Sequence, residues 1–174
     1  MSVEPTIGTL SLAVSGVKRL WGLHRAYTMG VFKDTDDGLR EEIVRRVGMV
    51  QTHLNTLEAR ALEEHNVQII QIAQRIRQNA TDFEQDVRMG VSGSATSLHP
   101  QAEKLDKKQI KKLLKLDYDI LERLVASTRL VNSALHDINT SPDAAKSAAL
   151  ELEQQLTGTK NRFSERLSFV AGIL

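Results

Sequence analysis

Six lysines lie close together in EKLDKKQIKKLLKLD, which covers residues 103–117. On a helical wheel this segment separates into a charged arc and an apolar side. Clustered ammonium groups opposite an apolar side suit anionic lipid, at about 1 kcal/mol per lysine near the membrane surface. The same pattern also describes the solvated face of an ordinary bundle helix, so both interpretations stay open. The arc holds Lys104, Lys108, Lys111, Lys112 and Lys115, with Lys107 at its edge, and the apolar side holds Leu105, Ile110, Leu113 and Leu116.

A second notable stretch, EPTIGTLSLAVSGVKRLWGLHRAY, covers residues 4–27 and carries no charge between Glu4 and Lys18. On a helix its small residues Gly8, Ser15 and Gly22 recur every seven positions. Small residues let another backbone approach closely, as between helices in membranes, and each glycine weakens a helix by about 1 kcal/mol relative to alanine. The stretch fits a central bundle helix or a helix that leaves the bundle and inserts into a membrane with Glu4 at the polar interface. Its apolar stripe is Ile7, Leu10, Val14, Val17 and Trp21.

Motifs of catalysis and of metal binding are absent from the sequence. There is no HExxH, no GxSxG and no glycine-rich phosphate loop. The histidines are scattered, and the residue three positions before His65 is Leu62, so the Glu-x-x-His motif of bundles that bind two metals is missing there. We therefore expect no enzyme activity, no cofactor and no metal. The five histidines are His24, His53, His65, His99 and His136.

The composition favours a single cytoplasmic domain. The chain has 174 residues, a net charge of +1 and no cysteine, which suits one domain in a reducing compartment and argues against a general nucleic-acid binder. No run reaches the roughly 18–20 apolar residues that span a bilayer. The acidic Glu4 stands where a signal peptide carries positive charge.

Apolar residues at alternating steps of three and four predict the helices that position these groups. The first long helix follows the N-cap candidates Asp34, Thr35, Asp36 and Asp37. Its apolar row is Leu39, Ile43, Val47, Val50, Leu54, Leu57 and Ala61. The second helix has the row Ile69, Ala73, Ile76, Ala80, Phe83 and Val87, and the third has Leu114, Tyr118, Leu121, Leu124, Thr128, Val131, Leu135 and Ile138. The row of the last helix is Ala145, Ala149, Leu152, Leu156, Thr159, Phe163, Leu167, Val170 and Leu174.

Three segments separate these rows. The register changes at residues 63–66, which predicts a break or a bend. Residues 89–100, MGVSGSATSLHP, predict a flexible loop, and NTSPD predicts a new helix with Ser141 as N-cap and Pro142 as its first residue. Together with the N-terminal stretch, the rows predict an all-α fold: an antiparallel bundle of four to five helices. We expect residues 1–174 to form one domain, either alone or as the N-terminal domain of a longer protein.

The start of the chain resembles a known family. MSVEPTIGTLSLAVSGVKRLW, with an acidic residue and a proline before a glycine-containing apolar helix, resembles the fungal HeLo and HeLo-like domains of the prion-inhibition type. The outline is also similar to the four-helix domain of the necroptosis pseudokinase and to helical N-terminal domains of fungal NOD-like receptors. The detailed likeness covers residues 4–21, and beyond about residue 60 only the bundle outline is similar.

The resemblance implies a domain that executes regulated cell death, in heterokaryon incompatibility or innate immunity. Such a domain is cytoplasmic at rest, moves to the plasma membrane on activation, self-associates and forms pores through its N-terminal helix. Its trigger is a C-terminal amyloid signalling region or a NOD-like receptor partner, but no Gly- or Asn-rich amyloid segment follows the bundle here. The alternatives are a soluble helical protein-interaction module without membrane activity and, third, a lipid-remodelling coiled coil.

Overall fold

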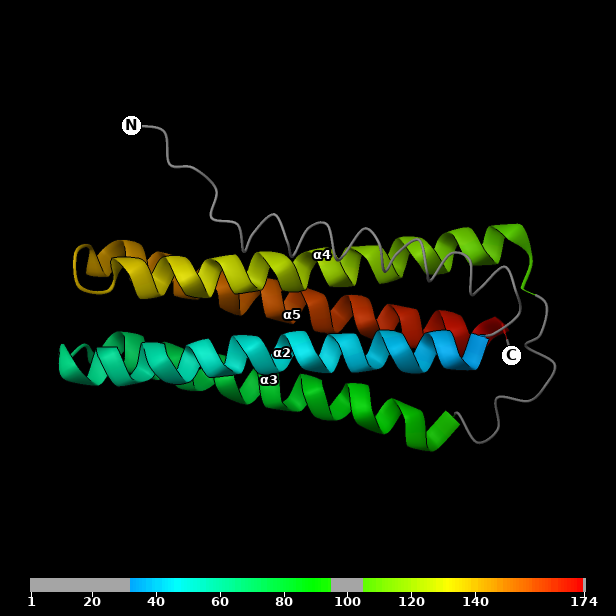
Figure 1. Ribbon diagram of the computed structural model, residues 1–174, viewed down its shortest axis with the longest axis horizontal. Coiled ribbons are helices and arrows are strands. Elements are labelled where there is room, and N and C mark those ends of the chain that lie inside the picture. The colour runs from blue at the N-terminus through cyan, green and yellow to red at the C-terminus, as the bar shows by residue number, and fades with distance from the viewer. Residues whose placement is uncertain (1–31, 95–104, 174) are drawn as a thin grey trace.

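Four long helices pack together in the computed structural model, which describes residues 32–94 and 105–173 (Figure 1). The predicted all-α fold is confirmed for these residues. The helix predicted from Pro5 to Trp21 lies outside them. The four helices are α2 (Phe32–Glu63), α3 (Val67–Ser94), α4 (Lys107–Asp137) and α5 (Pro142–Ile173).

Each helix runs antiparallel to the one before it, but not every pair of neighbours is antiparallel (Figure 1). Helix α2 packs against α3 and α4, and α5 packs against the same two helices. The neighbours α2 and α4 therefore run parallel, and so do α3 and α5. Contacts between α3 and α5 repeat at a constant sequence offset of 78, which only a parallel pair in register gives: Gln68 with Lys146, Arg75 with Glu153, and Asn79 with Thr157.

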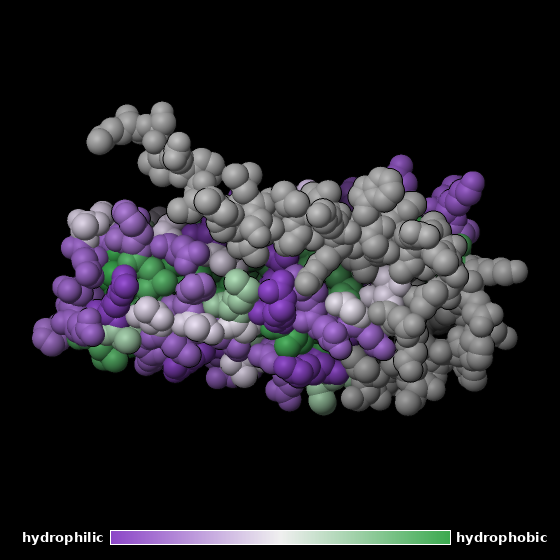
Figure 2. All heavy atoms as spheres, viewed as in Figure 1, coloured by the Kyte–Doolittle hydropathy of each residue, from purple (hydrophilic) through white to green (hydrophobic). Residues whose placement is uncertain are grey.

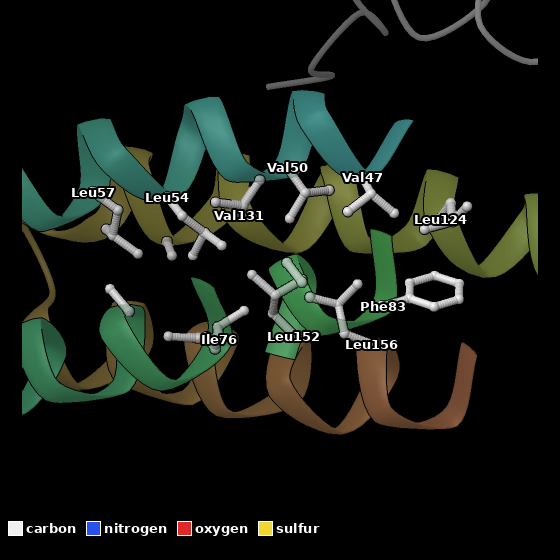
Figure 3. Packing of buried hydrophobic residues seen from close by; sticks show 14 of the residues in the cluster. Val47, Val50, Leu54, Leu57, Ile76, Phe83, Leu124, Val131, Leu152 and Leu156 are labelled. Carbon is white, nitrogen blue, oxygen red and sulfur yellow. The ribbon is translucent and has the colours of Figure 1, made fainter. Parts of the chain in front are cut away.

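The core follows a seven-residue repeat in which buried positions alternate by three and four, as in coiled coils. In Figure 3, Leu54 of α2, Ile76 of α3 and Leu152 of α5 point into the same apolar interior. Burying an aliphatic side chain of this size stabilises the fold by roughly 1.5–3 kcal/mol. The rows predicted for α2 and α3 are buried throughout, as are the predicted α5 residues Ala145, Ala149, Leu152, Leu156, Thr159, Phe163 and Val170.

The two predicted helix boundaries at residues 63–66 and 141–142 are confirmed. Helix α2 ends at Glu63, and His65 takes a left-handed backbone conformation with φ of 54°. The Asn66 N–H donates to the Ala61 carbonyl at 2.8 Å, and the Asn66 side chain accepts from the Ile69 N–H at 3.1 Å, which caps α3. Pro142 is the first residue of α5.

The predicted core row of α4 is wrong over its first two turns. Leu114 is half-buried and Tyr118 is 47 % exposed, whereas Leu113, Asp117 and Ile120 face the interior. The physical reason is the buried carboxylate of Asp117, which occupies a core position that an apolar pattern cannot reveal.

Two predicted boundaries also differ from the structure. Helix α2 begins at Phe32, so the acidic residues predicted to precede it lie inside its first turns, and Asp36 is buried there by ion pairing. Helix α3 continues to Ser94, so residues 89–94 of the predicted loop are helical. Residues 95–100 lie outside the described residues.

Candidate functional site

Five lysines line the outer side of the first nine residues of α4. We call this set the lysine face: Lys107, Lys108, Lys111, Lys112 and Lys115, all exposed. On the opposite side of the same turns, Ile110, Leu113 and Leu116 are buried. The structure thus separates charge from apolar surface in this segment. Lys104 lies outside the described residues.

A capping box fixes where α4 begins. The Asp106 carboxylate accepts from the backbone N–H groups of Lys108 at 2.7 Å and Gln109 at 2.8 Å, and the Gln109 side chain accepts from the Asp106 N–H at 2.8 Å. Reciprocal caps of this kind satisfy N–H groups that a helix start leaves without partners. The lysine face is therefore held on a well-defined helix.

The electrostatics of this helix start are unusual. The N-terminus of a helix carries partial positive charge and favours acidic side chains. The N-cap Asp106 supplies one carboxylate, but the first turn that follows holds no acid and begins with two lysines. Among the described residues, the only ion-paired lysine is Lys160, with Asp86 on α3. Lys112 lies over the Phe169 ring, 4.5 Å from its centroid, so its charge rests on an aromatic face. Five lysines thus gather at the start of α4 without an ion pair to any described carboxylate.

Elsewhere among the described residues, several charged side chains pair across helices. Arg75 pairs with Glu153 through two contacts of 2.9 and 3.0 Å, and Arg162 of α5 pairs with Asp119 of α4. Hydrophilic side chains cover most of the described surface in Figure 2, and they project at the end where α4 begins. The lysine face is as hydrophilic as the rest of the described surface, but its charges are all positive.

Tyr118 extends the lysine face and is the surface residue that the sequence pattern missed. It follows Lys111 and Lys115 at steps of four and three, so the three side chains lie along one row of α4. A half-exposed tyrosine beside lysines suits the interface of a membrane, where its ring contacts apolar surface and its hydroxyl stays hydrated. Reading the core row from Leu113 instead of Leu114 would have placed Tyr118 outside.

A buried group of charges joins the helices next to the lysine face. The Arg166 guanidinium, fully buried in α5, contacts the carboxylates of Asp117 in α4 and Asp36 in α2, each at 2.5 Å. Asp36 also pairs with Arg40 at 2.7 Å, and Arg40 donates to the Val87 carbonyl of α3 at 3.0 Å. We call Asp36, Asp117 and Arg166 the charged layer. It connects to all four helices through Arg40.

Arginine charges determine the ionisation of Asp36. Burial alone raises the pKa of this carboxyl, but the charges of Arg166 and Arg40 outweigh burial and hold the pKa below its ordinary value. Asp36 therefore stays ionised inside the bundle. The charged layer could not be predicted from the sequence, because acidic and basic residues ordinarily mark exposed positions.

The predicted membrane-insertion residues fall outside the described residues. These are Glu4, Ile7, Gly8, Leu10, Val14, Ser15, Val17, Trp21 and Gly22. Within residues 32–94 and 105–173, no helix has the length and apolarity to cross a bilayer, and no three potential metal ligands come together.

No protein-family model, curated protein or solved structure matches this chain. The resemblance to HeLo domains accordingly rests on the sequence of residues 4–21 alone.

Proposed function

We propose that this protein is a helical bundle that binds anionic membranes through the lysine face and permeabilises them in regulated cell death. The observation that supports binding is the lysine face itself: five exposed lysines in nine residues, with no described carboxylate in ion-pair contact, whereas several arginines of the same bundle are paired with carboxylates on other helices. A dense group of exposed lysines of this kind attracts anionic lipid.

The lysine face carries enough charge to raise the affinity for an anionic membrane substantially. At about 1 kcal/mol per lysine near an anionic surface, five lysines contribute about 5 kcal/mol. Since each 1.4 kcal/mol is about tenfold in affinity, this amounts to several thousandfold over a neutral face. The attraction weakens with salt because ions screen exposed charges beyond about 10 Å at 0.1 M.

The permeabilising step belongs to the N-terminal stretch in this proposal. The support is its sequence: an apolar stripe, the small residues Gly8, Ser15 and Gly22 at intervals of seven, and the resemblance to HeLo domains. The protein would be cytoplasmic at rest and reach the plasma membrane on activation, where copies pack along the small residues. An amyloid signalling region or a NOD-like receptor would supply the trigger.

Vesicle sedimentation tests the binding step. The protein is mixed with vesicles of phosphatidylcholine containing phosphatidylserine, and its bound fraction should fall as salt rises. Lys111→Gln together with Lys115→Gln should weaken binding about thirtyfold, from about 2 kcal/mol of lost attraction.

The matched control removes the same charge from α5, with Lys146→Gln and Lys160→Gln, and should bind as the parent does. If the α4 and α5 variants bind alike, the lysine face is an ordinary solvated surface. If the parent itself does not bind, the soluble interaction module becomes the better description.

A further inference from the structure

The apolar core of the bundle is divided in two. One large cluster draws on all four helices, and a small one consists of Ile110 and Leu113 of α4 with Val170 of α5. Along α4, Asp117 stands between Leu113 and the large cluster. Along α5, Arg166 stands between the large cluster and Val170. The charged layer thus marks the boundary between the clusters.

The small cluster defines an end unit, formed by residues 107–116 of α4 and 168–173 of α5. Among the described residues, its apolar core has three buried side chains, with Leu105, Leu114 and Phe169 packed against them. In Figure 1, the ribbons of α3 and α4 diverge toward this end. The whole lysine face belongs to the end unit.

The charged layer couples the two clusters weakly. Buried ion pairs lose in desolvation much of what they gain in attraction, so they contribute little net stability compared with apolar packing. Regions with few buried apolar contacts open at lower free energy than the core that they adjoin. Within residues 32–94 and 105–173, the end unit has both properties: few buried apolar contacts of its own, and a charged layer between it and the large cluster.

We propose that the charged layer lets the end unit open while the main core stays folded, and that this opening lays the first turns of α4 into the membrane interface. The lipid part of this inference rests on the proposed function. In the closed bundle Ile110, Leu113 and Leu116 are buried directly opposite the lysines. Once released, the segment is an amphipathic helix, with lysines for headgroups and aliphatic side chains for the acyl boundary.

Hydrogen exchange of the full chain without vesicles tests the opening. Amides of residues 111–116 should exchange at least about tenfold faster than those of residues 120–134 in the same helix, because the end unit opens separately. Exchange rates that agree within about threefold across the charged layer would overturn the proposal. This measurement needs no variant.

A variant that replaces the charged layer by apolar side chains tests whether the layer is what lets the end unit open. Asp117→Leu with Arg166→Leu keeps the net charge and leaves Asp36 its pair with Arg40. The matched control, Asp119→Asn with Arg162→Gln, removes a half-buried ion pair between the same two helices. The layer variant should slow exchange of residues 111–116 at least about tenfold, and the control should leave it unchanged. Equal exchange in the layer variant and the parent would overturn the assignment to the layer.

Sedimentation with phosphatidylserine vesicles tests the membrane part. The layer variant should bind these vesicles about fivefold more weakly than the parent, because its apolar side stays buried while its lysines are intact. Binding at the parental level, in a variant whose exchange has slowed, would overturn the lipid part alone. Failure of the proposed function looks different, because the Lys111 and Lys115 substitutions would then leave sedimentation unchanged.

Discussion

At the scale of residues, Arg166 shows how charge is built into the core. It occupies a position of the three-and-four spacing of α5, between Phe163 and Val170, where an aliphatic side chain is usual. Its contacts with Asp36 and Asp117 satisfy the charge. A polar residue at such a position specifies register, because a shifted helix would bury the charge away from its partners.

Replacing Arg166 alone should lower the free energy of unfolding far more than replacing Arg166 and Asp117 together. Arg166→Met alone should lower the free energy of unfolding by about 3–5 kcal/mol, since the Asp117 carboxylate loses the cation that it contacts. Adding Asp117→Leu removes the buried carboxylate that Arg166 contacts and should recover most of the lost free energy of unfolding. Urea unfolding followed by circular dichroism gives both values. Equal losses in the single and double variants would contradict this account.

The layer should also make the bundle sensitive to acid. Burial raises the pKa of Asp36, but the charges of Arg166 in α5 and Arg40 in α2 outweigh burial and hold the pKa below its ordinary value of 3.8. The other groups that contact these two arginines are the Asp117 carboxylate of α4, which contacts Arg166, and the Val87 carbonyl of α3, which accepts from Arg40. A carboxyl with a lowered folded pKa stabilises fully above the unfolded pKa and loses that contribution as pH falls toward the folded value. The melting temperature should therefore drop below about pH 4.

Asp36→Asn should flatten this pH dependence, and Asp37→Asn in the same turn of α2 is the control. The measurement is thermal unfolding of both variants and the parent through the acidic range. An Asp36→Asn variant with the parental slope would show that other carboxyls cause the acid sensitivity.

At the scale of elements, the buried row of a helix could be predicted from the sequence where that row consists of apolar residues alone. The rows of α2 and α3 consist of apolar residues throughout, so the sequence pattern located them fully. In α4 the buried row includes Asp117. An apolar pattern cannot include a charged residue, so the sequence predicted Leu114 and Tyr118 as core positions instead. Arg166 was missed because its partners lie on other helices, 49 residues away in the case of Asp117.

The corrected face of α4 leads to a prediction about Tyr118. Tyr118→Ala should weaken binding to phosphatidylserine vesicles several-fold, about 1 kcal/mol of interfacial contact, without changing its salt dependence. Leu150→Ala on α5, which removes another exposed apolar side chain, is the control. Vesicle sedimentation at two salt concentrations separates the two contributions. A Tyr118→Ala variant that binds as the parent does would restrict the site to the lysines.

At the scale of the whole molecule, the helices form two antiparallel hairpins that sit side by side with parallel neighbours. The offset of 78 between α3 and α5 fixes their register through polar contacts on the surface, and the charged layer fixes it inside. The sequence predicted an antiparallel bundle of four to five helices but not which helices are neighbours, since each row is compatible with several arrangements. That choice depends on pairs such as Arg75 with Glu153, which only the fold brings together.

The proposed function divides the molecule into a part that binds and a part that permeabilises, and this division can be tested in the full chain. Val14→Asp places a charge within the apolar stripe of the N-terminal stretch, at a cost of about 2.5–3.5 kcal/mol if that position enters the bilayer core. Dye leakage should then fall at least about tenfold, while sedimentation with vesicles stays at the parental level because the lysine face is intact. Ser2→Asp, outside the stripe, should leave both unchanged. Parental leakage from the Val14→Asp variant would move the permeabilising step away from the N-terminal stretch, and the end unit of α4 and α5 would remain as the part of the molecule that acts on lipid.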